Sequence, residues 1–158
     1  MLRVCTPEGD LDLSVIHGAA RNEDDVLQVS LAADIQSTVI SVRAETTEDS
    51  LVKLAKKLPK NWYIKSCYSC RYGHFCPVGD ADNEIFCVTE FEPKQVCDLW
   101  HVTEEPSERS RRSRTLFHVC PKYQPQSDAY FTYSDYRYKV GDTTHAQDPM
   151  QRFAPSSE

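Results

Sequence analysis

Apolar and polar residues alternate in the N-terminal third of the chain. Leu27, Val29 and Leu31 are separated by single polar residues, and the segment 37–43 is rich in β-branched side chains. A period of two is typical of strands with one buried face, and β-branched residues favour strands further. The pattern predicts two strands joined as a hairpin. Residues 1–24 carry no clear period, so we expect an irregular or weakly stranded lead-in.

The spacing becomes helical after position 46. The run TTED at 46–49 supplies an N-cap and an acidic first turn, and Leu51, Leu54 and Leu58 then fall on one helical face. This predicts a helix over 47–58 that ends before Pro59.

The central and C-terminal parts show shorter signals. Residues 61–66 and 85–91 are predicted to be strands, and Pro93 stands at a favourable helix start for a helix over 93–100. The segment 103–115 (TEEPSERSRRSRT) is polar and charged throughout, so we expect a solvated loop there.

Composition narrows the class of protein. The chain has 158 residues, about one domain's length, of which 40% are hydrophobic and 27% charged, so a fibrous or wholly disordered chain is excluded. No apolar run approaches the ~20 residues of a membrane span, and the first residues do not follow a signal-peptide pattern. The net charge of −6 disfavours nonspecific DNA binding. We therefore expect a cytoplasmic protein.

Cysteine distribution points to a metal. Six of the seven cysteines lie between positions 67 and 120, and only Cys5 stands apart. In a reducing compartment such a cluster favours metal binding over disulfides. The strongest signal is a C-x2-C pair followed by two later cysteines, and four thiolates complete a tetrahedral zinc shell. The spacing predicts a structural zinc site on Cys67, Cys70, Cys87 and Cys120.

Two other interpretations of the cysteines remain open. Cys67, Cys70 and Cys76, with a fourth ligand from Cys87 or Cys97, could hold an iron–sulfur cluster, and Cys76 precedes a proline as cluster ligands often do. Alternatively, the thiols are free cysteines in a core, since Cys is among the most buried residue types.

The cysteine segment also has a familiar form. The run LPKNWYIKSCYSCRYGHFCPVG, with the later IFC, KQVC and FHVCPKY, resembles an uncharacterised bacterial domain family. In that family a β-rich N-terminal part leads through an LPxxxYIKxCxxCxYS-like stretch into a cysteine-bearing C-terminal part. The similarity covers the region 45–125, departs from the family at Cys76 and in the arginine-rich 103–115 segment, and implies the same ligands: Cys67, Cys70, Cys87 and Cys120.

Signals for catalysis are weaker than the metal signal. His74, His101 and His118 lie among the cysteines, but no nucleophile-elbow context accompanies them, and the glycines stand singly. The basic run 109–114 could contact nucleic acid, although the acids at 104–108 nearly cancel its charge. We expect no enzymatic activity, and nucleic-acid binding is a less favoured alternative.

Aromatic residues accumulate after position 122 with little aliphatic company. Because Tyr offers a large contact area at low entropic cost, this aromatic arm is expected to dock on a partner protein or on the domain's own sheet. Its candidate contact residues are Tyr130, Phe131, Tyr133, Tyr136 and Tyr138.

Together these signals predict an α+β fold. A small antiparallel sheet packed by the 47–58 helix continues into a cysteine-rich, zinc-ribbon-like module at 61–122. The domain is expected to span 1–122, followed by the aromatic arm at 123–140 and a disordered tail at 141–158. The expected function is a non-enzymatic protein-binding module with structural zinc; the alternatives are an iron–sulfur redox protein and a zinc-dependent nucleic-acid-binding protein.

Overall fold

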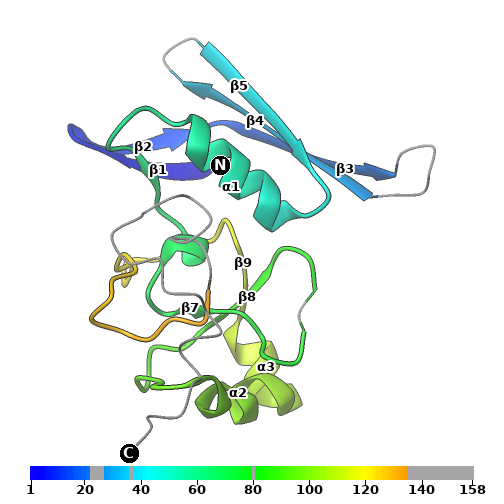
Figure 1. Ribbon diagram of the computed structural model, residues 1–158, viewed down its shortest axis with the longest axis vertical. Helices are drawn as coiled ribbons and strands as arrows, with labels where there is room; N and C mark the ends of the chain where they lie inside the picture. Colours follow the sequence, from blue (N-terminus) through cyan, green and yellow to red (C-terminus); the bar gives the residue numbers. More distant parts are fainter. Residues whose placement is uncertain (22–26, 36–37, 80, 135–158) are drawn as a thin grey trace, which may run out of the picture.

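The computed structural model describes residues 1–21, 27–35, 38–79 and 81–134. In these ranges the chain is α+β, with small antiparallel sheets and three helices (Figure 1). This confirms the predicted α+β class, whereas the zinc-ribbon-like module stays a prediction. The predicted tail at 141–158, and with it Tyr136 and Tyr138, lies outside the described residues. No described helix is long and apolar enough to cross a bilayer.

The N-terminal half contains two sheets. The first has the order β2-β1-β6, and the second has the order β3-β4-β5. Their strands are β1 (Leu2–Thr6), β2 (Gly9–Leu13), β3 (Val15–Arg21), β4 (Leu27–Ile35), β5 (Thr38–Ala44) and β6 (Tyr63–Ile64). The predicted hairpin is confirmed, since β4 and β5 pair antiparallel with Leu31 opposite Val42.

Residues 1–21, the described part of the predicted lead-in at 1–24, are more regular than the sequence predicts. Leu2 and Leu13 face each other across the β1–β2 ladder, and both are buried in the core. On the other face Arg3 and Asp12 form an ion pair at 2.6 Å. Gly9, at φ +132, begins β2 directly after the two-residue turn at 7–8. Backbone pairing between strands thus orders a segment that has no clear period of its own.

Helix α1 (Thr47–Lys57) matches the predicted 47–58 helix. Thr46 caps it as expected, because its Oγ1 accepts a hydrogen bond from the Asp49 N–H at 3.0 Å. A second cap comes from far along the chain: Asp82 accepts hydrogen bonds from the Thr47 N–H at 2.8 Å and from the Thr47 hydroxyl at 2.6 Å. Helix α1 packs on β4 and β5, as Figure 1 shows.

One hydrophobic core joins the N-terminal half to the cysteine-bearing half. It runs from the sheets and α1 into the segments that carry the cysteines, which lie below them in Figure 1. Fully buried members include Leu2, Leu51, Leu54, Ile64, Tyr68 and Ile85. Because the core is continuous, the cysteine-bearing half is packed against the sheets and helix of the N-terminal half.

The cysteine-bearing half is built from short elements. Strands β7 (Gly73–His74), β8 (Glu84–Cys87) and β9 (Ser113–Thr115) form its sheet, and α2 (Trp100–Glu104) and α3 (Pro106–Arg112) lie beside it. Short 3₁₀ turns occupy Cys67–Ser69 and Val96–Leu99. A second small core of Val88, Leu99 and Val102 lies here. The predicted strands at 61–66 and 85–91 exist in shortened form, as β6 and β8.

The prediction of a solvated loop at 103–115 is wrong. Most of this segment forms α3 and β9, and α2 ends within it. Helix α3 begins with Pro106 after a Glu105 side chain that accepts the Glu108 N–H at 2.8 Å. At its end Arg112 is only 5% exposed and pairs with Glu108 and Glu90. Ion pairing to a distant carboxylate lets this wholly polar segment fold.

Candidate metal centre

The C-x2-C pair sits in a tight turn. Cys67 and Cys70 are each 4% exposed, and the Cys70 N–H donates to the Cys67 carbonyl at 3.2 Å. The Gly73 N–H then donates to the Cys70 carbonyl at 3.0 Å. A Cβ on residue 73 would lie 2.1 Å from the Cys67 carbonyl oxygen, so only glycine fits there. Sequence reasoning missed Gly73; its position three residues after C-x2-C was the available signal.

Backbone pairing brings the two later cysteines to this turn. Cys87 ends β8 directly opposite Gly73 in the β7–β8 ladder. The Cys67 N–H donates to the His118 carbonyl at 2.7 Å, two residues before Cys120. Beyond Cys120 the chain folds back, and Pro125 bridges to Cys70. Three separate segments therefore deliver the four predicted ligands to one region of the molecule.

Three of the four thiols have a raised pKa. Burial, followed by the neighbouring thiols of Cys87, Cys70 and Cys120, raises the pKa of Cys67 to about 12. Burial is also the main cause that raises the pKa of Cys70 and of Cys87, and Cys120 acts on both. Nearby Arg114 opposes the rise at Cys67 and Cys87. Such effects act over short range, so the four thiols lie in the same region of the molecule.

The convergence stops short of a closed ligand set. Among the described residues, no group of three or more His, Cys, Asp or Glu side chains is arranged to hold a metal ion. The donor set nevertheless fits zinc, since four thiolate sulfurs complete its tetrahedral shell. Zinc binding to such thiols releases their protons, because the thiolate is the ligand.

The remaining cysteines lie apart from this region. Cys76 is buried, and its Sγ is 3.9 Å from Nη1 of Arg109. Cys97 is exposed beside Asp98, and Cys5 stands on β1 opposite Tyr63. None of these thiols is among the groups that act most strongly on the pKa of Cys67, Cys70 or Cys87. The choice between the predicted set of four and a set that includes Cys76 or Cys97 stays a prediction.

The histidines among the cysteines have other contacts. His74 is 1% exposed, and its Nδ1 accepts a hydrogen bond from the Tyr133 N–H at 3.1 Å. Burial lowers the pKa of His74 to about 4, so its ring is neutral at pH 7. His101 stacks on Phe91 with ring centroids 5.6 Å apart, and His118 contributes its carbonyl to Cys67. Within the described part of the chain, no hydrogen bond joins an imidazole to a thiol.

The described part of the aromatic arm lies on the domain. Phe131 and Tyr133 pack against the second core, and the Tyr133 carbonyl accepts the Phe75 N–H at 2.8 Å. Tyr130 is 38% exposed, with the Arg71 guanidinium 3.0 Å from its ring centroid. Phe131 and Tyr133 therefore dock on the domain itself, which was one of the two expected positions of the arm. A partner contact through the arm stays a prediction.

The arginines of α3 are paired. Arg109 binds Glu84 at 2.6 Å, Arg111 binds Glu90 at 2.7 Å, and Arg112 binds Glu108 at 2.8 Å. These ion pairs compete with any phosphate for the same guanidinium groups. The basic run therefore offers less positive charge to a nucleic acid than its sequence indicates.

Comparisons of the chain with protein-family models, curated proteins and solved structures found no match. The resemblance of the 45–125 region to an uncharacterised bacterial family therefore stays a prediction. What the protein does has to be inferred from its own side chains.

Proposed function

We propose that the protein is a non-enzymatic, protein-binding module held by one structural zinc ion. The proposed ligands are Cys67, Cys70, Cys87 and Cys120. The approach of these four thiols from three segments supports the proposal. The pKa of Cys67 is raised by all three other ligand thiols, that of Cys87 by Cys120 and Cys70, and that of Cys70 by Cys120. Four cysteines saturate zinc and leave no open position for a substrate, which is typical of structural sites.

A structural metal suits the construction of this half. Strand β7 has two residues and β9 has three, so the backbone ladders that join the segments are short. Small elements with few ladder bonds bury little surface each, and a metal that links them adds folding free energy directly. Zinc would tie the turn at Cys67–Ser69 to the end of β8 and to the chain after β9.

The surface of the same half supports a protein-binding role. Trp100 on α2 is 51% exposed and Tyr130 is 38% exposed. Aromatic side chains are enriched in protein interfaces because they fill pockets and still offer a polar group. The paired arginines of α3 and the net charge of −6 argue against a nucleic-acid surface.

Metal analysis with single Cys→Ser variants tests the ligand set. Purified protein should contain about one zinc per chain. Each of the four ligand variants should lose metal and thermal stability, whereas Cys5→Ser, Cys76→Ser and Cys97→Ser serve as matched controls that keep both. Stoichiometric iron and sulfide with visible absorbance would replace zinc by an iron–sulfur cluster. Loss of metal in Cys76→Ser with retention in Cys120→Ser would refute the ligand set.

The binding role is tested separately from the metal. Wild-type protein and the Trp100→Ala and Tyr130→Ala variants should be compared as baits, at equal zinc content, for retention of the same host protein. We expect one of the aromatic variants to lose it while Val78→Ala, which removes another exposed apolar side chain, keeps it. A host protein retained equally by all variants would contradict a role for these aromatic groups.

A further inference from the structure

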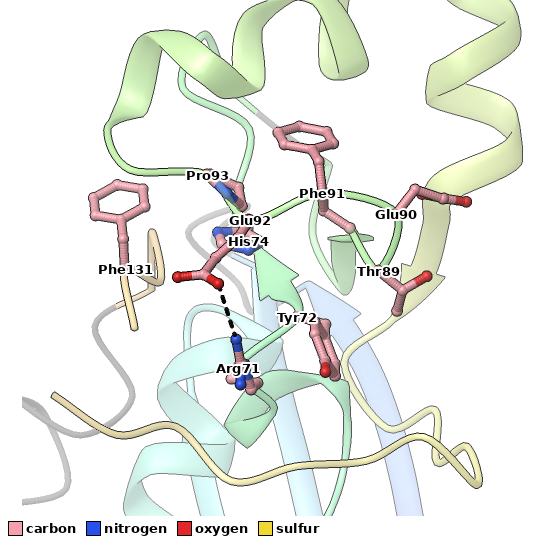
Figure 2. Close-up of a pocket in the computed structure, with 10 residues that line it drawn as sticks. Arg71, Tyr72, His74, Thr89, Glu90, Phe91, Glu92, Pro93 and Phe131 are labelled. Atoms are coloured by element: carbon pink, nitrogen blue, oxygen red, sulfur yellow. Dashed lines mark ion pairs between the residues drawn. The ribbon is translucent and has the colours of Figure 1, made fainter. Parts of the chain in front are cut away.

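A cavity of about 190 Å³ lies beside the aromatic arm, on the cysteine-bearing half. Its walls come from β7 and the residue pair before it, from the segment 88–93 that follows β8, and from Phe131 of the arm. Figure 2 shows the Glu92 carboxylate directed toward Arg71, with His74 between the segment 88–93 and Phe131. The space is the size of one amino-acid residue, and it combines apolar walls with charged groups.

His74 offers this cavity a fixed hydrogen-bond donor. Its Nδ1 accepts the Tyr133 N–H at 3.1 Å, so the neutral ring carries its proton on Nε2. No described residue makes a hydrogen bond to Nε2. Ser66 Oγ is the single fully buried side-chain nitrogen or oxygen atom without a partner among the described residues, so Nε2 is not fully buried. Since His74 is 1% exposed and lines the cavity, Nε2 faces this space. The Nε2–H of His74 can therefore donate a hydrogen bond to a ligand in the cavity.

Arg71 offers a second donor that is poorly satisfied. Its side chain is 12% exposed, and its guanidinium lies over the rings of Tyr130 and Tyr72. Nη1 donates to Oε1 of Gln124 at 3.2 Å. The carboxylate nearest to Nη2 is that of Glu92 at 3.9 Å, which is beyond hydrogen-bond length. A guanidinium buried to this extent normally binds a carboxylate with two short bonds.

The acids of the cavity wall leave room for another carboxylate. Glu92 is 43% exposed, and its other oxygen binds Lys94 at 2.6 Å, so it can turn away from Arg71 without losing a cationic partner. Glu90 is held by Arg111 and Arg112, which lie outside the cavity wall and balance its charge. The Glu92 carboxylate thus lies where an anionic ligand could bind, but it forms no hydrogen bond to Arg71.

We propose that this cavity binds the C-terminal residue of a partner protein. The terminal carboxylate displaces Glu92 from Arg71 and accepts the His74 Nε2–H, while an apolar last side chain packs against Phe131 and Pro93. The size of the cavity limits the bound group to one residue, and the two donors require an acceptor that carries negative charge. The inference rests on the proposed protein-binding function and names the part of the partner that is recognised.

Fluorescence anisotropy with the full-length, zinc-containing protein tests the inference. The probe is an N-terminally labelled peptide Gly-Ser-Gly-Ser-Phe with a free C-terminal carboxylate, and the control is the same peptide as its C-terminal amide. The free acid should bind saturably, and the amide should bind about tenfold more weakly because it loses a charge-assisted contact. Equal binding of acid and amide, or no binding of either, would overturn the inference.

Side-chain variants separate this site from general effects on folding. His74→Asn keeps an acceptor for the Tyr133 N–H and removes Nε2–H, and Arg71→Lys keeps the charge without the fork; each should weaken binding about fivefold. Glu92→Gln removes the competing carboxylate and should strengthen binding, whereas Glu104→Gln, an equal charge change on α2, should not. Weaker or unchanged binding by Glu92→Gln refutes the displacement.

Two further measurements identify the source of the carboxylate and separate a failure of this inference from a failure of the proposed zinc site. Free benzoate should compete weakly; competition as strong as that of the peptide would mean that the ligand is a small acid and not a chain terminus. Zinc content is measured on the same samples. Protein that contains zinc but binds no peptide refutes this inference alone, whereas protein without zinc refutes the proposed metal whatever the peptide does.

Discussion

Replacing Gly73 by alanine tests whether the close passage of β7 over the C-x2-C turn shapes the metal centre. An alanine Cβ would lie 2.1 Å from the Cys67 carbonyl oxygen and 3.0 Å from Ile85 Cδ1. The Ile85 side chain can rotate away. The Cys67 carbonyl cannot, because it accepts the Cys70 N–H at 3.2 Å and so closes the turn.

The cost follows from the movement that the new methyl group requires. The distance from Cβ to the Cys67 oxygen has to grow from 2.1 Å to the 3.4 Å or more of an ordinary contact. Overpacking of this kind costs about 1–3 kcal/mol, and the smaller entropy of an unfolded chain with alanine returns about 0.4–1 kcal/mol. We expect a net loss of about 1 kcal/mol, which lowers Tm by about 2–4 °C for a chain of this length.

The assay is thermal unfolding combined with zinc titration against a chromophoric chelator. Gly73→Ala should lower both Tm and zinc affinity, because the displaced carbonyl belongs to a ligand residue. Gly79→Ala is the control: its Cβ meets nothing within 4 Å, but its φ of +104 strains alanine, so it should lose stability and keep zinc affinity. Unchanged Tm and zinc affinity in Gly73→Ala would refute the steric reasoning.

Three further predictions concern stability. Asp82→Ala should cost about 1 kcal/mol in urea denaturation, because it removes the distant cap on Thr47; an unchanged midpoint would show that the Thr46 cap suffices. Burial lowers the pKa of His74 to about 4 in the folded protein, below its unfolded value of about 6.5, so the unfolded chain binds the proton first. The stability contributed by neutral His74 is therefore complete above about pH 6.5 and falls by about 3 kcal/mol as the pH drops to 4. His74→Asn should reduce this dependence of the unfolding free energy on pH. An identical pH dependence in both proteins would contradict the prediction. Arg112→Ala should cost about 1–2 kcal/mol in the same urea assay by removing a buried aliphatic stem and its ion pairs, whereas a loss near zero would mean that α3 is held by its caps alone.

Features with a local signal could be read from the sequence. The 47–58 helix was predictable because its cap at Thr46 and its apolar face lie within a dozen residues. The β4–β5 hairpin was predictable from alternation and β-branched residues alone. The C-x2-C spacing and the two later cysteines were likewise visible, and the structure brings these four thiols near one another.

Features that depend on distant partners could not be read in this way. The segment 103–115 has no apolar period, and it folds because Glu84 and Glu90, from another part of the chain, pair with its arginines. Gly73 is one of five single glycines in the sequence, and only the path of β7 over the Cys67 carbonyl makes it irreplaceable.

By itself, then, the sequence determined the 47–58 helix, the β4–β5 hairpin and which side chains can bind metal, since propensity, capping and thiol chemistry are properties of neighbours in the chain. The tertiary structure alone decided that Asp82 caps α1, that Tyr133 docks on His74, and that His74 lines a cavity. The physical reason is burial. A polar group removed from water needs a partner, and the partner is supplied by whichever distant segment the fold brings into contact.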